Sequence, residues 1–402
     1  MISVKGHVAR TTSMTSGDEC QETYNPLDNM RSEIQRNRLT FDQFRLAGGA
    51  VGYISYDAVR YWEKIPESAT NDLKFPDLEM AFFDDGIVFD HINRIAYYYF
   101  QNRDRLAEIK SRIQEATTDP EPFRYTTPTS NTSKDDFQEA VLKAKNYISS
   151  GDIFQAVLSK RYDFNFEGSL INFYRTLRNI NPSPYMYFLK MGERQVVGSS
   201  PEMLVRVENG LVETYPIAGT RPRTDDQAEN QILAEELLSD PKERAEHVML
   251  VDLARNDIGR IAEFGSVHTP EFMTVHQYSH VQHIVSRVVG KMRPDMDCFD
   301  ALKVMLPAGT VSGAPKVRAM EIIEELEPTR RGPYAGAVGY FSNNGNADFA
   351  ITIRTLTAQQ NRASIQVGAG IVADSDPERE WFETEQKAAA LMKALEKAGE
   401  MI

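Results

Sequence analysis

Cysteine is almost absent from this chain of 402 residues, which contains only Cys20 and Cys298. Two thiols cannot form a disulfide framework or a thiolate zinc site, so a reducing compartment is expected. Long apolar runs are also lacking, and none approaches the roughly 20 residues of a membrane-spanning helix. Met1 is not followed by the pattern of a signal peptide. These absences predict a soluble, cytoplasmic protein without a membrane partner.

Basic residues are fewer than acidic ones: 45 Lys and Arg stand against 58 Asp and Glu, for a formal net charge of −13. An acidic chain with scattered bases argues against nucleic acid or an anionic membrane as the partner. The length allows two or three ordinary domains, or one large interleaved domain.

Composition changes along the chain predict its organisation. Residues 12–36 are polar and turn-rich without helical or strand periodicity, so we expect partial disorder there. Residues 117–133 carry three prolines among Thr, Ser and Asn and are typical of a linker. We therefore predict an N-terminal segment at 1–116, this linker, and a larger domain at 134–402. Strand-like runs with few crossover helices favour an α+β fold of packed antiparallel sheets flanked by helices.

Two Glu-x-x-Glu pairs, Glu243/Glu246 and Glu380/Glu383, each lie just inside a predicted helix. We expect Asp240 to cap the first helix with Pro241 at its first position, and Asp376 to cap the second, which starts at Pro377. Residues three apart on a helix lie on nearly the same face. If the pairs converge, four carboxylates would hold a hard divalent cation, most naturally Mg²⁺ shared with an anionic substrate. Local roles are the alternatives: Glu243 completes a capping box with Asp240, and Glu380 favours the dipole of a helix N-terminus.

Several residues are candidates for binding an anion. Gly219 exposes a backbone N–H beside the Thr220 hydroxyl at the end of a strand, unless this turn is only strand punctuation. Arg354 could fork a carboxylate next to Gly368-Ala369-Gly370 on the following strand. The alternatives are an Arg on a solvated face and a Gly-x-Gly that only marks a bulge. Tyr334 adds a phenolic donor.

Two titratable residues complete the candidates. His283 lies in an apolar strand-like run, where a lone His is more often a satisfied core residue than a functional one. Glu202 follows the tight turn Ser199-Ser200-Pro201, and its plain alternative is an exposed loop acid.

Long motifs follow one another in a fixed order between Asp136 and the C-terminus. In chain order they are Ser150–Gln155, Asn181–Met186, Ser200–Glu202, Pro216–Arg223, Glu246–Asp257, Gly309–Lys316 and Gly368–Ser375. Together they closely resemble the chorismate-utilising enzymes, and among these the large subunits (component I) of anthranilate synthase. The resemblance implies an α+β fold of packed antiparallel sheets, with a chorismate-binding catalytic domain at 134–402.

The resemblance also implies roles for the candidate residues. Glu246 and Glu383 would ligate Mg²⁺, with Glu243 and Glu380 as supporting ligands. Glu202 would protonate the departing 4-hydroxyl of chorismate and His283 would assist a later proton transfer, with Thr310 as a third catalytic residue. The two substrate carboxylates would be held by Gly219, Thr220, Tyr334, Arg354, Gly368, Ala369 and Gly370.

Two positions distinguish the sister enzymes of this family. The resembling isochorismate and salicylate synthases carry Lys where this chain has Gln155, and aminodeoxychorismate synthases commonly carry Lys in place of Ala218. Both differences favour anthranilate and pyruvate, made from chorismate and ammonia in the first committed step of tryptophan biosynthesis. The alternatives are an aminodeoxychorismate synthase and a catalytically impaired subunit.

The resemblance further implies a separate glutamine amidotransferase subunit, because neither cysteine lies in the Gly-flanked elbow of such enzymes. The Leu-Glu-Ser and Arg-Tyr-Ser motifs that normally open the family have no counterpart here, so we expect a truncated N-terminal sheet. Asn181-Pro182-Ser183-Pro184-Tyr185-Met186 resembles one half of the family's tryptophan-inhibition pocket. The other half is the missing Leu-Glu-Ser strand, so we expect weak tryptophan binding.

Overall fold

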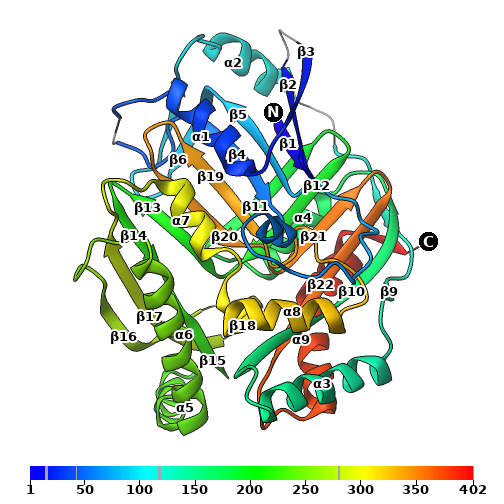
Figure 1. Cartoon of the computed structure of the whole chain (residues 1–402). Helices are drawn as coiled ribbons and strands as arrows, with labels where there is room; N and C mark the ends of the chain where they lie inside the picture. Colours follow the sequence, from blue (N-terminus) through cyan, green and yellow to red (C-terminus); the bar gives the residue numbers. More distant parts are fainter. Residues whose placement is uncertain (14–16, 42, 116–118, 279–280, 402) are drawn as a thin grey trace.

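The computed structural model describes the chain except for residues 14–16, 42, 116–118, 279–280 and 402. Two large sheets face each other and helices cover their outer sides and ends (Figure 1). Neighbouring strands are antiparallel throughout the larger sheet and almost throughout the smaller one. The predicted α+β class with packed antiparallel sheets is therefore confirmed.

The larger sheet combines both ends of the chain. In spatial order it contains β15 (Ile217–Pro222), β17 (Val281–Lys291), β14 (Leu211–Thr214), β13 (Met203–Glu208), β20 (Ala347–Ile351), β19 (Ala337–Ser342), β4 (Gly49–Ile54), β5 (Leu78–Phe83), β1 (Ile2–Lys5), β2 (Val8–Ser13) and β3 (Gly17–Glu22), with β16 (His268–Gln277) on β17. The glycines of β4 allow close strand approach, since a Cβ at Gly52 would lie 2.1 Å from the carbonyl oxygen of Glu79.

The smaller sheet is built around two long central strands, β22 and β10. Its order is β11 (Tyr185–Met191), β12 (Arg194–Ser200), β21 (Thr355–Gln359), β22 (Arg362–Ile371), β10 (Gln155–Glu167), β8 (Phe123–Tyr125) and β23 (Gly399–Met401), with β18 (Gly313–Ala314) and β9 (Thr129–Ser130) also on β10. A separate hairpin is formed by β6 (Asp85–Asp90) and β7 (Ile95–Phe100).

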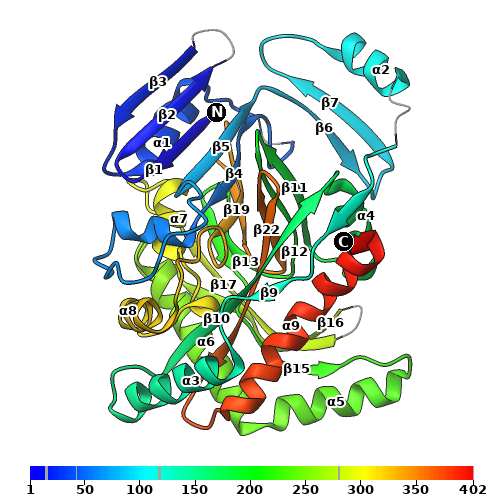
Figure 2. The ribbon, with the colours of Figure 1, turned by 90° about the vertical axis from the view of Figure 1, so that its right-hand side faces the viewer.

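The helices are α1 (Pro26–Arg36), α2 (Leu106–Glu115), α3 (Lys134–Ser149), α4 (Ile171–Ile180), α5 (Gln227–Ser239), α6 (Pro241–Gly259), α7 (Cys298–Met305), α8 (Lys316–Leu326) and α9 (Pro377–Ala398), with 3₁₀ turns η1 (Tyr56–Tyr61) and η2 (Gly309–Val311). Helix α6 packs on β15 and β17 of the larger sheet, and α9 packs on β22 of the smaller one (Figures 1 and 2). These two helices thus approach each other from different sheets.

Both α6 and α9 begin where the sequence predicts. Asp240 accepts hydrogen bonds from the N–H groups of Lys242 and Glu243, and Pro241 takes the first helical position. Asp376 caps α9 in the same way, with Pro377 following it. An aspartate cap with proline at the first position fixes the start of a helix to one residue, so each Glu-x-x-Glu pair lies in the first two turns.

Aromatic side chains anchor the core between the larger sheet and α7. The ring of Phe341 lies 4.2 Å from that of Phe299 and 4.7 Å from that of Phe349, measured between centroids. Burying one such side chain contributes about 1.5–3 kcal/mol. A second apolar cluster, around Phe123 and Phe173, joins α4 and α9 to the smaller sheet.

The expected disorder at 12–36 is wrong for the described part of this segment, which forms the end of β2, β3 and α1; residues 14–16 lie outside the described residues. Asn25 caps α1 and Pro26 takes its first position, so these residues start a helix rather than a turn. Leu27, Met30 and Ile34 form a short buried stripe. Three apolar residues are too few to give a helical period in the sequence, but the larger sheet buries them.

The predicted linker at 117–133 carries β8 and β9, which pair with β10, while residues 117 and 118 lie outside the described residues. Strands from both sides of this segment share the larger sheet, since β4 pairs with β19. The chain is therefore interleaved. Within the described ranges, none of the helices combines the length and the apolar character needed to cross a membrane.

Candidate active site

The predicted site residues come from β15, β17, β22, α6, α9 and the η2 turn, and from the loops that hold Glu202, Tyr334 and Arg354. The labelled strands β15, β17 and β22 and the helices α6 and α9 lie in the lower half of the molecule in Figure 1. Glu246, in α6, faces the carboxylates of other predicted metal ligands. Burial raises the pKa of Glu246, and the charges of Glu243 and Glu383 raise it further. Burial also raises the pKa of Glu380, and the charge of Glu383 adds to this. The two Glu-x-x-Glu pairs therefore converge from α6 and α9.

The convergent carboxylates fit a hard cation. The Oε2 atom of Glu380 is buried and has no hydrogen-bond partner. Among the residues that the structure describes, no three acidic, His or Cys side chains are already arranged as direct metal ligands. Mg²⁺ usually keeps several waters and takes one or two protein carboxylates.

The capping box expected for Glu243 is not formed, because the backbone N–H of Asp240 donates to the carbonyl of Glu236. The N–H of Glu243 donates to the Asp240 carboxylate, and the Glu243 carboxylate lies 3.5 Å from the Arg221 guanidinium. A Cβ at Gly219 would lie 2.9 Å from Oε2 of Glu243. The carboxylate thus reaches the loop that was expected to bind an anion.

That loop leaves the strand ladder. The register between β15 and β17 shifts between Ala218 and Arg221, and Gly219 has φ +66°, a left-handed value that favours glycine. The shift takes Gly219 and Thr220 out of regular pairing, which suits backbone groups that bind a ligand. The carbonyl of Gly219 accepts a hydrogen bond of 2.7 Å from Nδ1 of His283.

His283 is held as one tautomer by this hydrogen bond. With the proton on Nδ1, the Nε2 atom carries the free lone pair. Burial lowers the pKa of His283, so the ring is neutral at pH 7. The ring of Tyr278 packs edge-on against it, with 5.5 Å between centroids. His283 is therefore a neutral imidazole held in one orientation, with Nε2 able to accept a proton.

Arg354 is a cation without an acid partner. Among the described residues, the one hydrogen bond of its guanidinium goes to the carbonyl of Lys387, at 3.2 Å. Burial lowers the pKa of Arg354, and its backbone has a left-handed φ of +51°. A partly buried guanidinium without a counter-charge is costly unless an anion binds there.

Tyr334 and β22 lie beside this cation. The charge of Arg354 acts on the Tyr334 hydroxyl, whose pKa burial raises. A Cβ at Gly368 would lie 2.8 Å from that hydroxyl oxygen, so only glycine fits. Ala369 points its side chain into an apolar cluster and offers only its backbone. At Gly370 a Cβ would lie 2.8 Å from Nε2 of Gln155.

Lys387 is a site residue that the sequence reasoning missed. Its Nζ lies 2.7 Å from Oε1 of Glu383 and donates a 3.0 Å hydrogen bond to the carbonyl of Gly368. It thus connects the carboxylate cluster to the glycines of β22. The available signal was its spacing, because Lys387 lies four residues after Glu383 on one face of α9.

Glu202 has the environment of a general acid. Burial raises its pKa to about 7, although the Thr310 hydroxyl lowers it by donating a hydrogen bond of 2.7 Å to Oε1. An acid with a pKa near 7 is protonated in a useful fraction of molecules at neutral pH. The η2 turn therefore brings Thr310 into direct contact with the predicted acid.

The sequence profile of the family described as chorismate binding enzyme matches residues 4–393. The chain belongs to the chorismate-binding enzymes. The anthranilate synthase component 1 of Methanothermobacter marburgensis is 51% identical to this enzyme over 389 residues, which are 96% of this chain and 83% of that protein. The predicted resemblance to this family is therefore confirmed.

Solved structures agree with this assignment. The crystal structure of anthranilate synthase component I from Streptococcus pneumoniae superposes with a TM-score of 0.84 and 38% identity, over 97% of this enzyme and 91% of that chain. The menaquinone-specific isochorismate synthase of Escherichia coli shares the fold, with a TM-score of 0.72 and 21% identity over 98% of this chain and 85% of the other. The expected truncation is not borne out, because the matches span 83% and 91% of these two relatives. Strands β1, β2 and β3 lie at one edge of the larger sheet.

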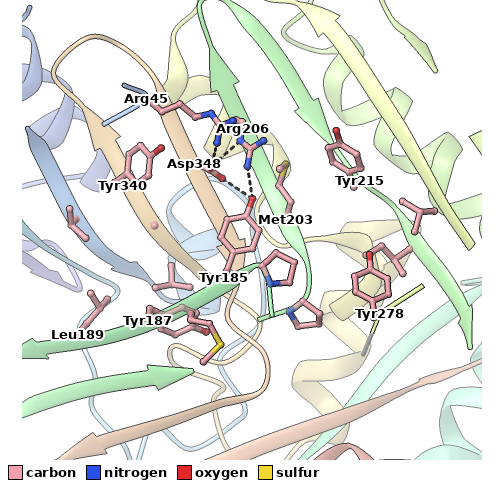
Figure 3. Close-up of a pocket in the computed structure, with 18 of the residues that line it drawn as sticks. Arg45, Tyr185, Tyr187, Leu189, Met203, Arg206, Tyr215, Tyr278, Tyr340 and Asp348 are labelled. Atoms are coloured by element: carbon pink, nitrogen blue, oxygen red, sulfur yellow. Dashed lines mark hydrogen bonds and ion pairs between the residues drawn. The ribbon is translucent and has the colours of Figure 1, made fainter. Parts of the chain in front are cut away.

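A cavity of about 600 Å³ lies between the two sheets, apart from the carboxylate cluster (Figure 3). Pro184, Tyr185 and Met186 of the predicted tryptophan motif line it. Its opposite wall includes Val51 of β4 and Tyr340 of β19, which were not predicted. Asn181, Pro182 and Ser183 precede the lining segment, and the carbonyl of Asn181 accepts a hydrogen bond from the Ser199 hydroxyl.

The pKa of Glu202 gives a test of the acid. A general acid works in its protonated form, so kcat/KM for chorismate should fall as the pH rises through about 7. The Thr310 hydroxyl stabilises the ionised carboxylate. Removing it in Thr310→Val should raise the pKa of Glu202 and move this fall to higher pH by about one unit.

The measurement is kcat/KM between about pH 5.5 and 9 for the wild type, Thr310→Val and the control Thr127→Val, whose hydroxyl lies on the surface far from Glu202. The control should keep the wild-type profile. An unchanged profile in Thr310→Val contradicts the assignment.

Proposed function

We propose that this enzyme converts chorismate and ammonia to anthranilate and pyruvate, the first committed step of tryptophan biosynthesis. The observation that carries the proposal is the Arg354 guanidinium, which has no acid partner among the described residues and lies beside Tyr334 and the glycines of β22. Chorismate is a dianion, and its enolpyruvyl carboxylate supplies the missing charge. The names of the relatives support anthranilate as the product.

The second carboxylate of chorismate fits the opposite side of the site. The backbone at Gly219 and Thr220 leaves the ladder of β15 and offers N–H donors. Lys387 adds a positive charge between this side and β22. Fixed donors and cations at both ends of the substrate orient the ring between them.

The first chemical step is the attack of ammonia on carbon 2 of the ring. The ring double bonds shift, and the bond between carbon 4 and its hydroxyl oxygen breaks. Hydroxide is a poor leaving group, so Glu202 donates its proton to that oxygen and water leaves. With its pKa raised to about 7, Glu202 thus supplies the proton that this step needs.

The second step removes pyruvate and makes the ring aromatic. A base takes the proton from carbon 2, and the bond between carbon 3 and the enolpyruvyl oxygen breaks. The released enolpyruvate takes up a proton on its methylene carbon and becomes pyruvate. His283 is neutral and presents Nε2 as the free base. We assign the proton transfer to this atom.

Mg²⁺ held by Glu246 and Glu383, with Glu243 and Glu380 in support, would neutralise the ring carboxylate of chorismate. Burial and the charges of Glu243 and Glu383 raise the pKa of Glu246. The ionised form of Glu246 is therefore disfavoured in the protein alone, and a bound cation would stabilise it.

Two buried residues explain the choice of nucleophile. Gln155 cannot deprotonate water as the Lys of the isochorismate-type enzymes would. Its buried Oε1 has no hydrogen-bond partner among the described residues, so it is free to accept a hydrogen bond from ammonia. Ala218 is buried and has no group that could attack carbon 2. Both support the use of ammonia.

The test is incubation with chorismate, ammonium and Mg²⁺, followed by the fluorescence of anthranilate. We expect turnover that is lost in excess chelator and reduced at least about 10- to 100-fold in Glu246→Gln or Glu383→Gln. Asp252→Asn is the matched control, because Asp252 lies on the same helix as Glu246 but is 73% exposed and pairs only with Arg255 within the described residues. It should keep full activity.

Separation of the products distinguishes the alternatives. A para-amino product indicates an aminodeoxychorismate synthase, and no product in the presence of a folded chain indicates an impaired subunit. Full activity in chelator or in Glu246→Gln contradicts the metal assignment.

Ammonia reaches the site from a second protein in this proposal. Glutamine hydrolysis needs a cysteine nucleophile activated by a neighbouring base. Cys298 is buried, and burial raises its pKa far above the usual range, whereas Cys20 lies on β3 at the edge of the larger sheet. The glutamine amidotransferase subunit, component II, is therefore the proposed partner, and both free thiols suit the cytoplasm.

We expect the purified chain to make anthranilate from ammonium but not from glutamine. Addition of the amidotransferase subunit should establish glutamine-dependent activity. The ammonium reaction with the same preparation is the control for active protein. Anthranilate from glutamine with this chain alone contradicts the partner proposal.

The cavity between the sheets is the proposed tryptophan site. Among the described residues that line it, Asp348 has the one carboxylate, and this accepts hydrogen bonds from Arg206 at 2.8 Å and from Tyr185 at 2.9 Å (Figure 3). The ammonium group of an amino acid thus has no free acid to pair with. An unpaired charge is costly in such a site.

We therefore expect tryptophan to bind with a Kd of about 1 mM or weaker. Tryptophan is titrated into the ammonia-dependent reaction and, independently, into the protein alone in a calorimeter. Micromolar inhibition together with micromolar binding contradicts this expectation.

A further inference from the structure

We propose that Arg331, in a buried pair with Glu327, is a positioning residue that holds the acid side and the substrate side of the site in register. This inference rests on the proposed function. Arg331 follows α8 and directly precedes the turn that leads to Tyr334. The side chains of Arg331 and Glu327 are only 2% and 6% exposed.

The pair contacts two separate elements, η2 and β10. The Arg331 guanidinium donates to both oxygens of Glu327, at 2.9 and 2.6 Å. Its remaining donors go to two backbone carbonyls, those of Val311 at 2.7 Å and Val157 at 2.6 Å. The same Glu327 carboxylate accepts 2.8 Å hydrogen bonds from the N–H and the hydroxyl of Ser159. One planar group thus fixes η2 against β10.

The contact at Val311 leads to the acid. Val311 ends the η2 turn, and Thr310 in that turn donates the hydrogen bond to Glu202. Val157 is bonded again to this region, because its N–H donates to the carbonyl of Ser312 at 2.8 Å. The position of the Thr310 hydroxyl therefore depends on where Arg331 holds the Val311 carbonyl.

The contacts at Ser159 and Tyr334 lead to the substrate. Ser159 pairs with Gly368 in the register of β10 and β22. The Arg331 guanidinium lies 5.6 Å from the ring centroid of Tyr334 and 4.7 Å from that of Tyr56. It therefore packs against the residue whose hydroxyl adjoins Gly368.

The geometry of arginine is needed for these contacts. Its planar fork satisfies a carboxylate and two carbonyls at once, whereas a lysine ammonium is a point charge on a flexible stem. Arg331→Lys keeps the charge beside Glu327 but cannot reach both Val311 and Val157. A displacement of about 1 Å at reacting groups is enough to lower the rate about 100-fold.

The test compares Arg331→Lys with Arg161→Lys. Arg161 is also buried, lies on β10 itself and forms ion pairs with Asp72 and Asp163, but it contacts none of the site residues described above. We expect Arg331→Lys to lower kcat about 10- to 100-fold with KM changed by less than about twofold. Arg161→Lys should lower the melting temperature to a similar degree and keep kcat.

A crystal structure of Arg331→Lys provides a readout that needs no turnover. The Thr310 hydroxyl should lie beyond hydrogen-bond distance of Glu202, while Arg161→Lys keeps the contact. If Thr310 is displaced in Arg331→Lys but the wild type makes no anthranilate, the two ideas separate. The displacement supports the positioning role of Arg331, and the missing anthranilate contradicts the proposed function. If Arg331→Lys does not fold, the pair Arg331→Met with Glu327→Gln leaves no unpaired charge, and the same loss of kcat is expected.

Wild-type kcat in Arg331→Lys with Thr310 in place overturns the inference. Equal losses of kcat in the Arg331 and Arg161 variants, in proportion to their loss of stability, also overturn it, because the role is then only structural.

Discussion

Carboxylates that lie beside one another in a partly buried site repel, and this enzyme holds four of them together on two helices. Burial and the neighbouring charges raise the pKa of Glu246 and of Glu380. The cost of this repulsion is met by helices whose starts are fixed by Asp240 and Asp376 and whose bodies pack on different sheets. The arrangement of the site depends on this constraint, because the packing of α6 and α9 fixes the backbone positions from which the acids extend.

The site also contains two positive groups, Lys387 and Arg354. Lys387 lies between the acidic cluster and the backbone of Gly368, and Arg354 is left without an acid partner among the described residues. In the proposed function, the cation without a protein counter-charge and the acids with few neighbouring cations would form the two ends of a site for a dianion and a divalent metal.

The parts of this arrangement that depend on neighbouring residues in the chain could be predicted from the sequence. The caps at Asp240 and Asp376, the two Glu-x-x-Glu pairs and the glycine at 219 are signalled within a few residues, and the structure has the predicted helix starts and the left-handed glycine. Helix α1 was missed because its apolar stripe is short. Lys387 and the buried Arg331 were missed because their partners, Gly368 and Val311, come from elsewhere in the chain. Long-range contacts of this kind leave no local pattern.

The cavity and the catalytic residues share part of their walls. Pro201 lines the cavity and precedes Glu202, while Tyr278 lines the cavity and packs on His283. A ligand in the cavity changes catalysis only if it binds one conformation of this shared wall more tightly than another. The far side of this wall is held by hydrogen bonds, since the Ser200 hydroxyl donates to the carbonyl of Ile351 and the N–H of Ile351 donates to the backbone carbonyl of Glu202. Movement at the cavity therefore reaches Glu202 through the backbone that carries it, with no need for a change in α6 and α9, which carry the proposed metal ligands.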